Sequence, residues 1–306
     1  MLESILLPQV DPSPFKQAAY FTDVPVQQFV NSAVNAPEGI YLTGGNTTDS
    51  NRVNYLFDPT ANTFARKADT PMSISSHAAI YVNGKLYLHG GINGTQYQGL
   101  LFRYDPVINQ WVQLATGPAV YAHGFVEFNN KLYIFSGLNA QNQVTEFMHV
   151  YDIATNTWAQ LPRQSNWPVS RGHYGWCRVG NRGFLHGGYR NDAIFAGQMG
   201  DAWLYDFVSN TWTRCIDSPV PMHTHQIDEL NGNIYTGGAW SNNHNDVGSD
   251  RIFEYNPRRN QWRRILKAGY SYWSTRWVIR GGVGFLIGGS PDATPASSTR
   301  TIWKVS

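Results

Sequence analysis

The chain has 306 residues, of which 14% are charged and 14% aromatic, and it contains 29 glycines and 16 prolines. Such a composition is typical of many short strands joined by turns. Its formal net charge of +2, without a basic block or an acidic tail, gives no reason to expect nucleic acid as a partner.

The N-terminal segment contains an acidic residue, Glu3, and an apolar run that ends at Pro8. That run is too short for a signal peptide or a membrane-spanning helix. The two cysteines, Cys177 and Cys215, are too few for a disulfide scaffold. We therefore expect a cytoplasmic or virion-associated protein that is not inserted in a membrane.

Along the chain, a short apolar motif that ends in glycines occurs six times. Its copies are IYLTGG (40–45), LYLHGG (86–91), LYIFSG (132–137), GFLHGG (183–188), IYTGGA (234–239) and GFLIGG (284–289), with last residues 46, 46, 51, 51 and 50 positions apart. Self-similarity at a fixed period is the signature of a repeat architecture. The glycines suit strand ends where the backbone takes a positive φ or packs closely against a neighbour.

A second motif follows each of the first five copies. It reads LFDPTANTF (56–64), RYDPVINQW (103–111), VYDIATNTW (150–158), LYDFVSNTW (204–212) and EYNPRRNQW (254–262). The spacing from Asp or Asn to the final aromatic residue is constant while the preceding loop varies in length, which predicts a fixed hairpin between two strands. We expect its Asp to accept hydrogen bonds from turn amides and its Asn to take the left-handed conformation.

Each repeat is therefore predicted to contain four antiparallel strands. The sixth repeat reaches only its third strand, RTIWKV (300–305), where the sequence ends. Residues 18–24 have the pattern of a fourth strand that lacks a repeat of its own. We predict that this segment pairs with the C-terminal strand and closes a ring, leaving no unpaired edge, with residues 1–17 as an N-terminal tail.

Six repeats of this kind resemble the kelch-repeat β-propeller family over roughly residues 18–306. The glycine pairs carry the resemblance, together with Tyr104, Tyr151, Tyr205, Tyr255, Trp111, Trp158, Trp212 and Trp262. The resemblance implies an all-β fold, a six-bladed kelch-type β-propeller with four antiparallel strands per blade, closed by an N-terminal strand that completes the last blade. Ser136 in place of a glycine and Phe64 in place of a tryptophan are departures that affect single blades.

Alternating strand directions place the loops between second and third strands on the same face as the junctions between blades. We call this the loop face, and the opposite face, which carries the hairpins of the second motif, the turn face. Binding residues concentrate in variable loops, so we predict a ligand-binding site on the loop face of blades four to six. Its candidates are Trp167, Arg171, His173, Tyr189, Arg190, His223, Trp240, His244, Tyr272, Trp273 and Arg276.

Aromatic rings mixed with Asn, Arg and His suit a sugar or an extended peptide, through stacking and hydrogen bonds. The alternative that remains open is that Trp167 and Trp273 pack between blades. These features favour a non-enzymatic binding protein that recognises a protein or a glycan, such as a receptor-binding or decoration component of a phage or another assembly, attached through the N-terminal tail. The second interpretation is a sugar-active enzyme similar to the sialic acid mutarotases, which are six-bladed kelch propellers.

Polar residues recur at one depth of the predicted first strands. They are His77, His123 and His225, with Asn31, Tyr174 and Thr275 at the equivalent positions. A ring of these residues could surround the central channel, and three histidines could in principle bind a metal. The resemblance to kelch repeats implies local hydrogen bonding instead, so we expect neither a metal nor another cofactor.

Charged residues follow four positions later on the same strands. Tyr81, Glu127, Arg178 and Glu229 occupy these positions in repeats two to five. Two carboxylates beside an arginine could act as general acid and base, but their place near the turn favours a solvated channel mouth. The sequence contains no nucleophile motif or phosphate-binding loop, and it assigns no catalytic residue. We expect no disulfide between Cys177 and Cys215, because the two residues should lie on opposite sides of their blade.

Overall fold

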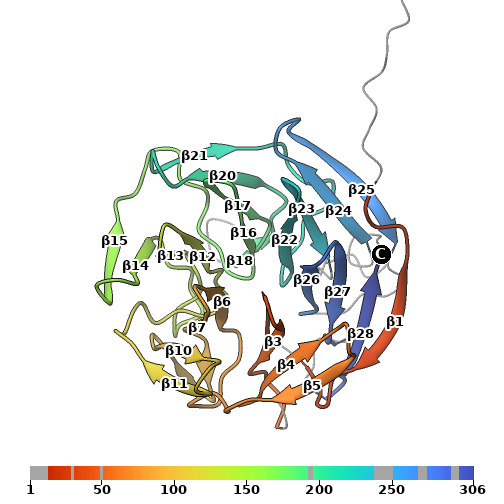
Figure 1. Ribbon diagram of the computed structural model, residues 1–306. Coiled ribbons are helices and arrows are strands. Elements are labelled where there is room, and N and C mark those ends of the chain that lie inside the picture. The colour runs from red at the N-terminus through yellow and green to blue at the C-terminus, as the bar shows by residue number, and fades with distance from the viewer. Residues whose placement is uncertain are drawn as a thin grey trace, which may run out of the picture.

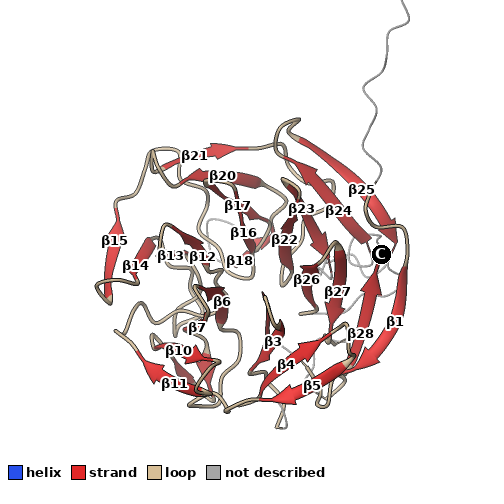
Figure 2. Ribbon diagram, in the orientation of Figure 1, coloured by secondary structure: helices blue, strands red, loops and turns tan. Residues whose placement is uncertain are grey.

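The computed structural model of the chain describes residues 13–28, 31–48, 51–191, 196–237, 251–267, 274–290 and 296–306. These residues form six four-stranded antiparallel sheets arranged as blades around a central axis, which confirms the predicted six-bladed propeller (Figure 1). Strands and loops make up the whole of the described chain (Figure 2). The described residues thus provide no apolar helix of the length that crossing a bilayer requires.

Within each blade the strands follow one another outwards from the channel. Blade one contains β2 (Ser32–Ala36), β3 (Gly39–Thr43), β4 (Asn54–Asp58) and β5 (Thr63–Arg66). Blade two contains β6 (Ala78–Val82), β7 (Lys85–His89), β10 (Leu101–Asp105) and β11 (Gln110–Gln113). Blade three contains β12 (Val126–Phe128), β13 (Lys131–Phe135), β14 (Met148–Asp152) and β15 (Thr157–Leu161).

The remaining blades repeat this arrangement. Blade four contains β16 (Gly175–Val179), β17 (Arg182–His186), β20 (Ala202–Asp206) and β21 (Thr211–Arg214). Blade five contains β22 (Gln226–Leu230), β23 (Asn233–Gly237), β24 (Arg251–Asn256) and β25 (Gln261–Lys267). Blade six contains β26 (Arg276–Arg280), β27 (Val283–Ile287) and β28 (Thr301–Val305), and its outer strand is β1 (Ala18–Asp23).

The N-terminal strand closes the ring as predicted. β1 pairs antiparallel with β28, so that Ala18 lies opposite Val305 and Asp23 opposite Thr301, and the two strands lie side by side in Figure 1. Phe15, which we had placed in the tail, is buried and packs edge-on against Tyr235 and Trp277 of blades five and six. The tail boundary is therefore corrected: an apolar anchor precedes β1, and residues 15–17 contact the propeller.

Loops and blade junctions meet on the loop face, as the strand directions require. Isolated bridges join Ser75 to Ile92, Tyr121 to Leu138 and Gly172 to Tyr189. Two of these loops form hairpins of their own, β8 (Ile92–Asn93) with β9 (Gln96–Tyr97) in blade two and β18 (Tyr189–Asn191) with β19 (Ala196–Gln198) in blade four. The loop face is therefore held together by backbone hydrogen bonds between loop and junction.

The repeated hairpin of the turn face has the predicted turn chemistry. In blade three, the Asp152 Oδ1 atom accepts hydrogen bonds from the amides of Ala154 and Thr155, at 3.0 and 3.2 Å. Asn156 takes the left-handed conformation, with φ of 56°, and its Oδ1 atom accepts a hydrogen bond from the Tyr151 hydroxyl at 2.8 Å. The aromatic residue, the Asp and the Asn of the motif are thus explained by the turn itself.

The same hairpin also binds the blade before it. The Asn156 Oδ1 atom accepts the amide of Ala115 at 2.9 Å, and the Trp158 Nε1 atom donates to the Ala115 carbonyl at 2.9 Å. We call this Asn and Trp pair the hairpin clasp. Blades two and five make the same two bonds, to Ala68 and to Ile216 respectively. In these three blades the recurring Trp therefore joins its own blade to the one before it.

Candidate functional site

The central channel contains a cavity of about 340 Å³ that all six blades line. Its walls are the first strands β2, β6, β12, β16, β22 and β26 and the residues that lead into them. Each first strand begins at the loop face, so the junction residues surround the mouth of the channel there. Pockets of this size, formed where several elements converge, are the usual place for a ligand.

Residues in the left-handed conformation surround this mouth. They are Ser76, Ala122, His173, Thr224 and Ser274, with φ between 52° and 58°. Backbone hydrogen bonds connect neighbouring members of the set: the Ala122 amide donates to the Ser76 carbonyl at 2.9 Å, the His173 amide to Ala122 at 2.7 Å, and the Thr224 amide to His173 at 2.8 Å. A non-glycine residue at positive φ is uncommon, and these residues occupy the same position in successive repeats, so the surrounding fold holds the backbone of the mouth in a fixed conformation.

Arg276 supplies a positive charge inside the channel. Its Nε atom donates to the Asn31 carbonyl at 2.7 Å, and within the described chain its guanidinium has no carboxylate partner. Burial lowers the pKa of Arg276 to about 10, so the side chain stays charged at neutral pH. Arg276 is half-buried, and a cation that is partly removed from water without a paired anion costs free energy, part of which a bound anion would recover.

The groups near Arg276 at the loop-face end are neutral. Burial, with the nearby Arg276 charge as a further cause, lowers the pKa of His173 to about 4, so its imidazole is uncharged at neutral pH. The Asn31 side chain is 1% exposed; its Nδ2 atom donates to Gln28 at 2.7 Å, and its Oδ1 atom has no partner within the described residues. Arg276 therefore dominates the electrostatics of this end of the channel.

The acidic groups of the channel are already engaged elsewhere. Glu127 forms an ion pair of 2.7 Å with Arg178 of the next blade. Asp228 accepts hydrogen bonds from the amides of Ile279 and Glu229, both at 2.8 Å. Neither carboxylate is bonded to Arg276, so the site can hold an anionic group of a ligand.

A row of rings extends from the channel mouth across the loop face. Successive ring centroids are 5.2 Å apart from Tyr97 to Tyr121, 6.4 Å from Tyr121 to His173, 6.1 Å from His173 to His223 and 5.3 Å from His223 to Tyr189. Tyr97, His173 and Tyr189 are partly exposed. Partly exposed aromatic rings beside a cation are typical of surfaces that bind proteins.

Comparison with known proteins decides the family. A profile described as the KLHDC2/KLHL20/DRC7 Kelch-repeats domain matches residues 116–289, which is more than half of the chain, and a second one, the Kelch motif, matches residues 74–118. The chain belongs to the kelch-repeat family. Kelch propellers generally mediate protein–protein interaction.

Individual relatives are more distant. The chain is 28% identical to Kelch domain-containing protein 10 of Xenopus tropicalis over 156 residues, 47% of this chain and 37% of the relative. It is 24% identical to Kelch-like protein 38 of Homo sapiens over 254 residues, 78% of this chain and 41% of the relative. It is 23% identical to Kelch-like protein 36 of Mus musculus over 290 residues, 84% of this chain and 44% of the relative. This kelch propeller thus spans less than half the length of these relatives.

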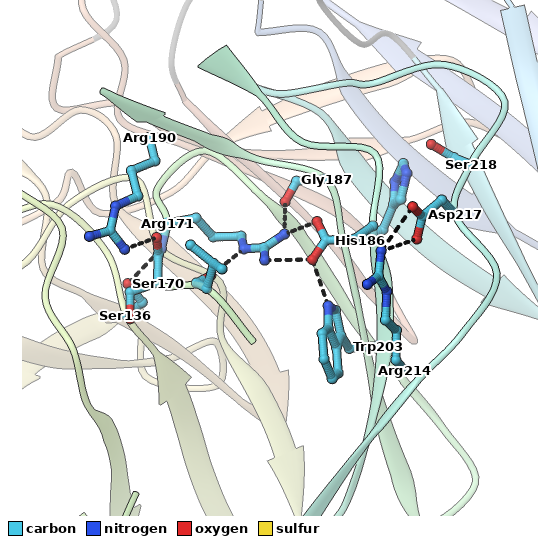
Figure 3. Close-up of polar contacts among 12 residues, drawn as sticks. Ser136, Ser170, Arg171, His186, Gly187, Arg190, Trp203, Arg214, Asp217 and Ser218 are labelled. Atoms are coloured by element: carbon cyan, nitrogen blue, oxygen red, sulfur yellow. Dashed lines mark hydrogen bonds and ion pairs between the residues drawn. The ribbon is translucent and has the colours of Figure 1, made fainter. Parts of the chain in front are cut away.

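Two residues predicted to bind a ligand are instead part of the packed interior. Arg171 is 0% exposed, and its guanidinium pairs with both oxygens of Asp201, at 2.5 and 2.8 Å (Figure 3). It also donates to the carbonyls of Gly187 and Val169, at 3.0 and 2.7 Å. Trp167 is 8% exposed and packs against Phe135 and Trp212 between blades three and four. Neither side chain is available to a ligand.

The other predicted residues are divided between the site and its surroundings. Arg276 and His173 line the channel, and Tyr189 and His223 belong to the row of rings. Arg190 is 5% exposed, and its Nη2 atom lies 3.7 Å from a carboxylate oxygen of Glu146. Trp240, His244, Tyr272 and Trp273 lie outside the described residues.

The recurring histidines join blades, as the resemblance implied, and do not face one another across the channel. His77 hydrogen-bonds to Thr43 at 2.9 Å, His123 to His89 at 3.0 Å and His225 to His186 at 3.0 Å, each on the second strand of the preceding blade. No group of metal-binding side chains occurs in the described parts of the chain. Cys177 and Cys215 are both buried, and neither forms a disulfide.

The ligand site predicted from the sequence did not include Tyr97, Tyr121 or Asn31. The prediction weighted blades four to six because their loops are longest, whereas Tyr97 and Tyr121 come from shorter loops of blades two and three. The sequence indicates Asn31 only as the residue that takes the place of the recurring histidine in the first repeat. A signal was available for the tyrosines, since both occur where the repeat places a loop-face segment.

Proposed function

We propose that this kelch propeller is a protein-binding module that holds an acidic group of a partner protein at the loop-face end of its central channel. The observation that carries the proposal is Arg276, a charged guanidinium inside the channel with no carboxylate partner within the described chain. His173 lines the channel beside it, and its neutral imidazole carries one N–H group that can donate to an acidic ligand. The row of rings from Tyr97 to Tyr189 supplies the adjoining contact surface.

A protein partner is favoured over a glycan on two grounds. Kelch propellers generally mediate protein interaction. The glycan interpretation relied on exposed tryptophans, of which Trp167 is buried and Trp240 and Trp273 lie outside the described residues. Attachment to a phage or another assembly through the N-terminal tail has no support among the described residues.

The experiment is a peptide-display selection on the purified propeller, followed by affinity measurement of the selected peptides by fluorescence anisotropy. Arg276→Ala should weaken binding by about 2 kcal/mol or more, a loss of about thirtyfold, because the carboxylate loses its partner in a poorly solvated site. Arg276→Lys should retain part of the affinity. Replacing the acidic residue of the peptide by its amide should match Arg276→Ala in effect.

Arg178→Ala is the matched control, because Arg178 lies at the other end of the channel and pairs with Glu127. It should bind the selected peptides as the wild type does. Equal affinity of the wild type and a folded Arg276→Ala variant would refute the proposal. An array on which acidic glycans alone bind, in an Arg276-dependent manner, would replace the protein ligand by a sugar.

A further inference from the structure

The hairpin of blade five differs in charge from the four others on the turn face. The segments 58–64, 105–111, 152–158 and 206–212 each contain one Asp and no other charged residue, so each carries one negative charge. The segment NPRRNQW (256–262) has Asn in place of that Asp and adds Arg258 and Arg259, so it carries two positive charges. This hairpin connects β24 to β25, at the periphery of the propeller in Figure 1.

Neither change is required by the turn. The Asn256 Oδ1 atom accepts the amide of Arg259 at 2.9 Å, as Asp206 accepts the amide of Ser209 at 2.9 Å in blade four. Asn260 keeps the left-handed conformation, with φ of 50°. The backbone is therefore the same with or without the carboxylate, and folding does not account for the reversed charge.

The two arginines are exposed and unpaired. Arg258 and Arg259 both lie at the tip, and their guanidinium groups make no hydrogen bond or ion pair within the described chain. The nearby carboxylate of Asp217 is bound by Arg214, at 3.1 and 3.0 Å. The positive charge of the tip is thus not neutralised by the propeller.

An exposed apolar side chain lies beside the arginines. The Ile216 amide donates to Asn260 at 2.9 Å and its carbonyl accepts from Trp262 at 3.0 Å, which fixes Ile216 against this hairpin. Its side chain is 52% exposed. The corresponding residues in the other clasps are Ala68 and Ala115, so blade five combines two free cations with a larger apolar group.

We infer that Arg258, Arg259 and Ile216 form a second docking site, on the turn face, for an acidic segment of a protein. Guanidinium groups bind carboxylates with two parallel hydrogen bonds, and Ile216 suits an apolar residue between the acidic ones. Nucleic acid fits less well, because useful affinity for a duplex rests on about 6–10 phosphate contacts, and membrane recruitment on clusters of about 4–8 basic residues. This inference is independent of the channel site, and the two faces together would join two partners.

The test uses a short fluorescein-labelled peptide rich in Glu and Leu, and fluorescence anisotropy at low ionic strength. Arg258→Ala with Arg259→Ala should weaken binding about tenfold, the loss expected for two exposed charge pairs. The matched control is Val107→Asp with Ile108→Asp, which lowers the net charge by the same two units at the same hairpin positions of blade two. That control, and Arg276→Ala, should bind within about twofold of the wild type, and thermal melting should show every variant folded.

Three results would overturn the inference. Equal losses in the blade-two and blade-five variants would mean that the peptide senses only net charge. A loss in Arg276→Ala alone would assign the peptide to the channel site, which leaves the proposed function intact. Tighter binding of a single-stranded oligonucleotide or of phosphatidylserine vesicles, abolished by the same double variant, would give the arginines a different ligand.

Discussion

Lowering the pH from 7 to about 5.5 should strongly destabilise this propeller, because nearly all of its histidines are buried in the neutral form. Burial is the main cause that lowers the pKa of all eight described histidines, with values of about 3 for His77, His123, His186 and His223. In the unfolded chain each would titrate near 6.5. Between pH 6.5 and 3 the unfolded state therefore binds more protons, so stability is greatest above pH 6.5 and falls as the pH falls.

The size of the effect follows from the number of groups. A histidine with a pKa of 6.5 when unfolded and about 3 when folded lowers the free energy of unfolding by about 1 kcal/mol between pH 7 and pH 5.5. Six histidines are fully buried, namely His77, His89, His123, His186, His223 and His225. Their sum is roughly 6 kcal/mol, which is comparable to the whole stability of an ordinary domain. We expect the folded state to be lost between about pH 6 and pH 5.

Urea unfolding followed by tryptophan fluorescence, at several pH values between 7.5 and 5.5, measures this dependence. His77→Gln is the informative variant, because glutamine can retain a hydrogen bond to Thr43 without titrating, and it should reduce the slope of stability against pH by about one proton near pH 5.5. A change of less than about 2 kcal/mol in the wild type over this range would refute the reasoning, since it would mean that the folded state binds protons almost as readily as the unfolded chain.

Three further predictions concern stability, each measured by urea unfolding at neutral pH. Arg171→Met should lower the free energy of unfolding by about 3–5 kcal/mol, because the carboxylate of Asp201 loses its partner. Adding Asp201→Leu should restore most of this stability, since apolar residues occupy the same pair of positions in blade two. Equal stability of the single and double variants would contradict this reasoning. Asn156→Ala should cost about 1–3 kcal/mol through the lost clasp to Ala115, and an unchanged midpoint would show that the clasp is not stabilising. Phe15→Ala should cost about 3–5 kcal/mol by leaving a cavity between blades five and six, and a cost below about 1 kcal/mol would show that Phe15 is not an anchor.

The architecture could be predicted from the sequence because each repeat contains the same turn. The spacing from Asp152 to Trp158 occurs in five copies, and each copy is a hairpin in the structure. The closing strand was predictable for the same reason, since the missing outer strand of the last repeat had to come from elsewhere. Phe15 was missed because it precedes the strand pattern and contacts residues more than two hundred positions away.

The site was less predictable because its residues share no pattern. From the sequence, Arg171 was expected at the surface. In the structure its backbone carbonyl accepts a hydrogen bond from the amide of Gly137. The carbonyls of Ile74, Val120 and Met222 accept the same bond from glycines of the other blades, so Arg171 occupies a position that is apolar in those blades. Only its distant partner Asp201 makes an arginine acceptable there. Exposure and pairing depend on contacts between segments that are separated along the chain, which a single sequence does not display.

The direction of the hairpin clasp bears on how the molecule is assembled during synthesis. The clasp of blade three holds Ala115 at the end of blade two, and that of blade two holds Ala68 at the end of blade one. Each of these blades therefore seals the edge of the blade made before it, as blade five does through Ile216. The strand β1 precedes all six inner strands in the chain, yet it finds its partner β28 only after every blade has been made. Until then, β1 remains available for pairing with the wrong edge.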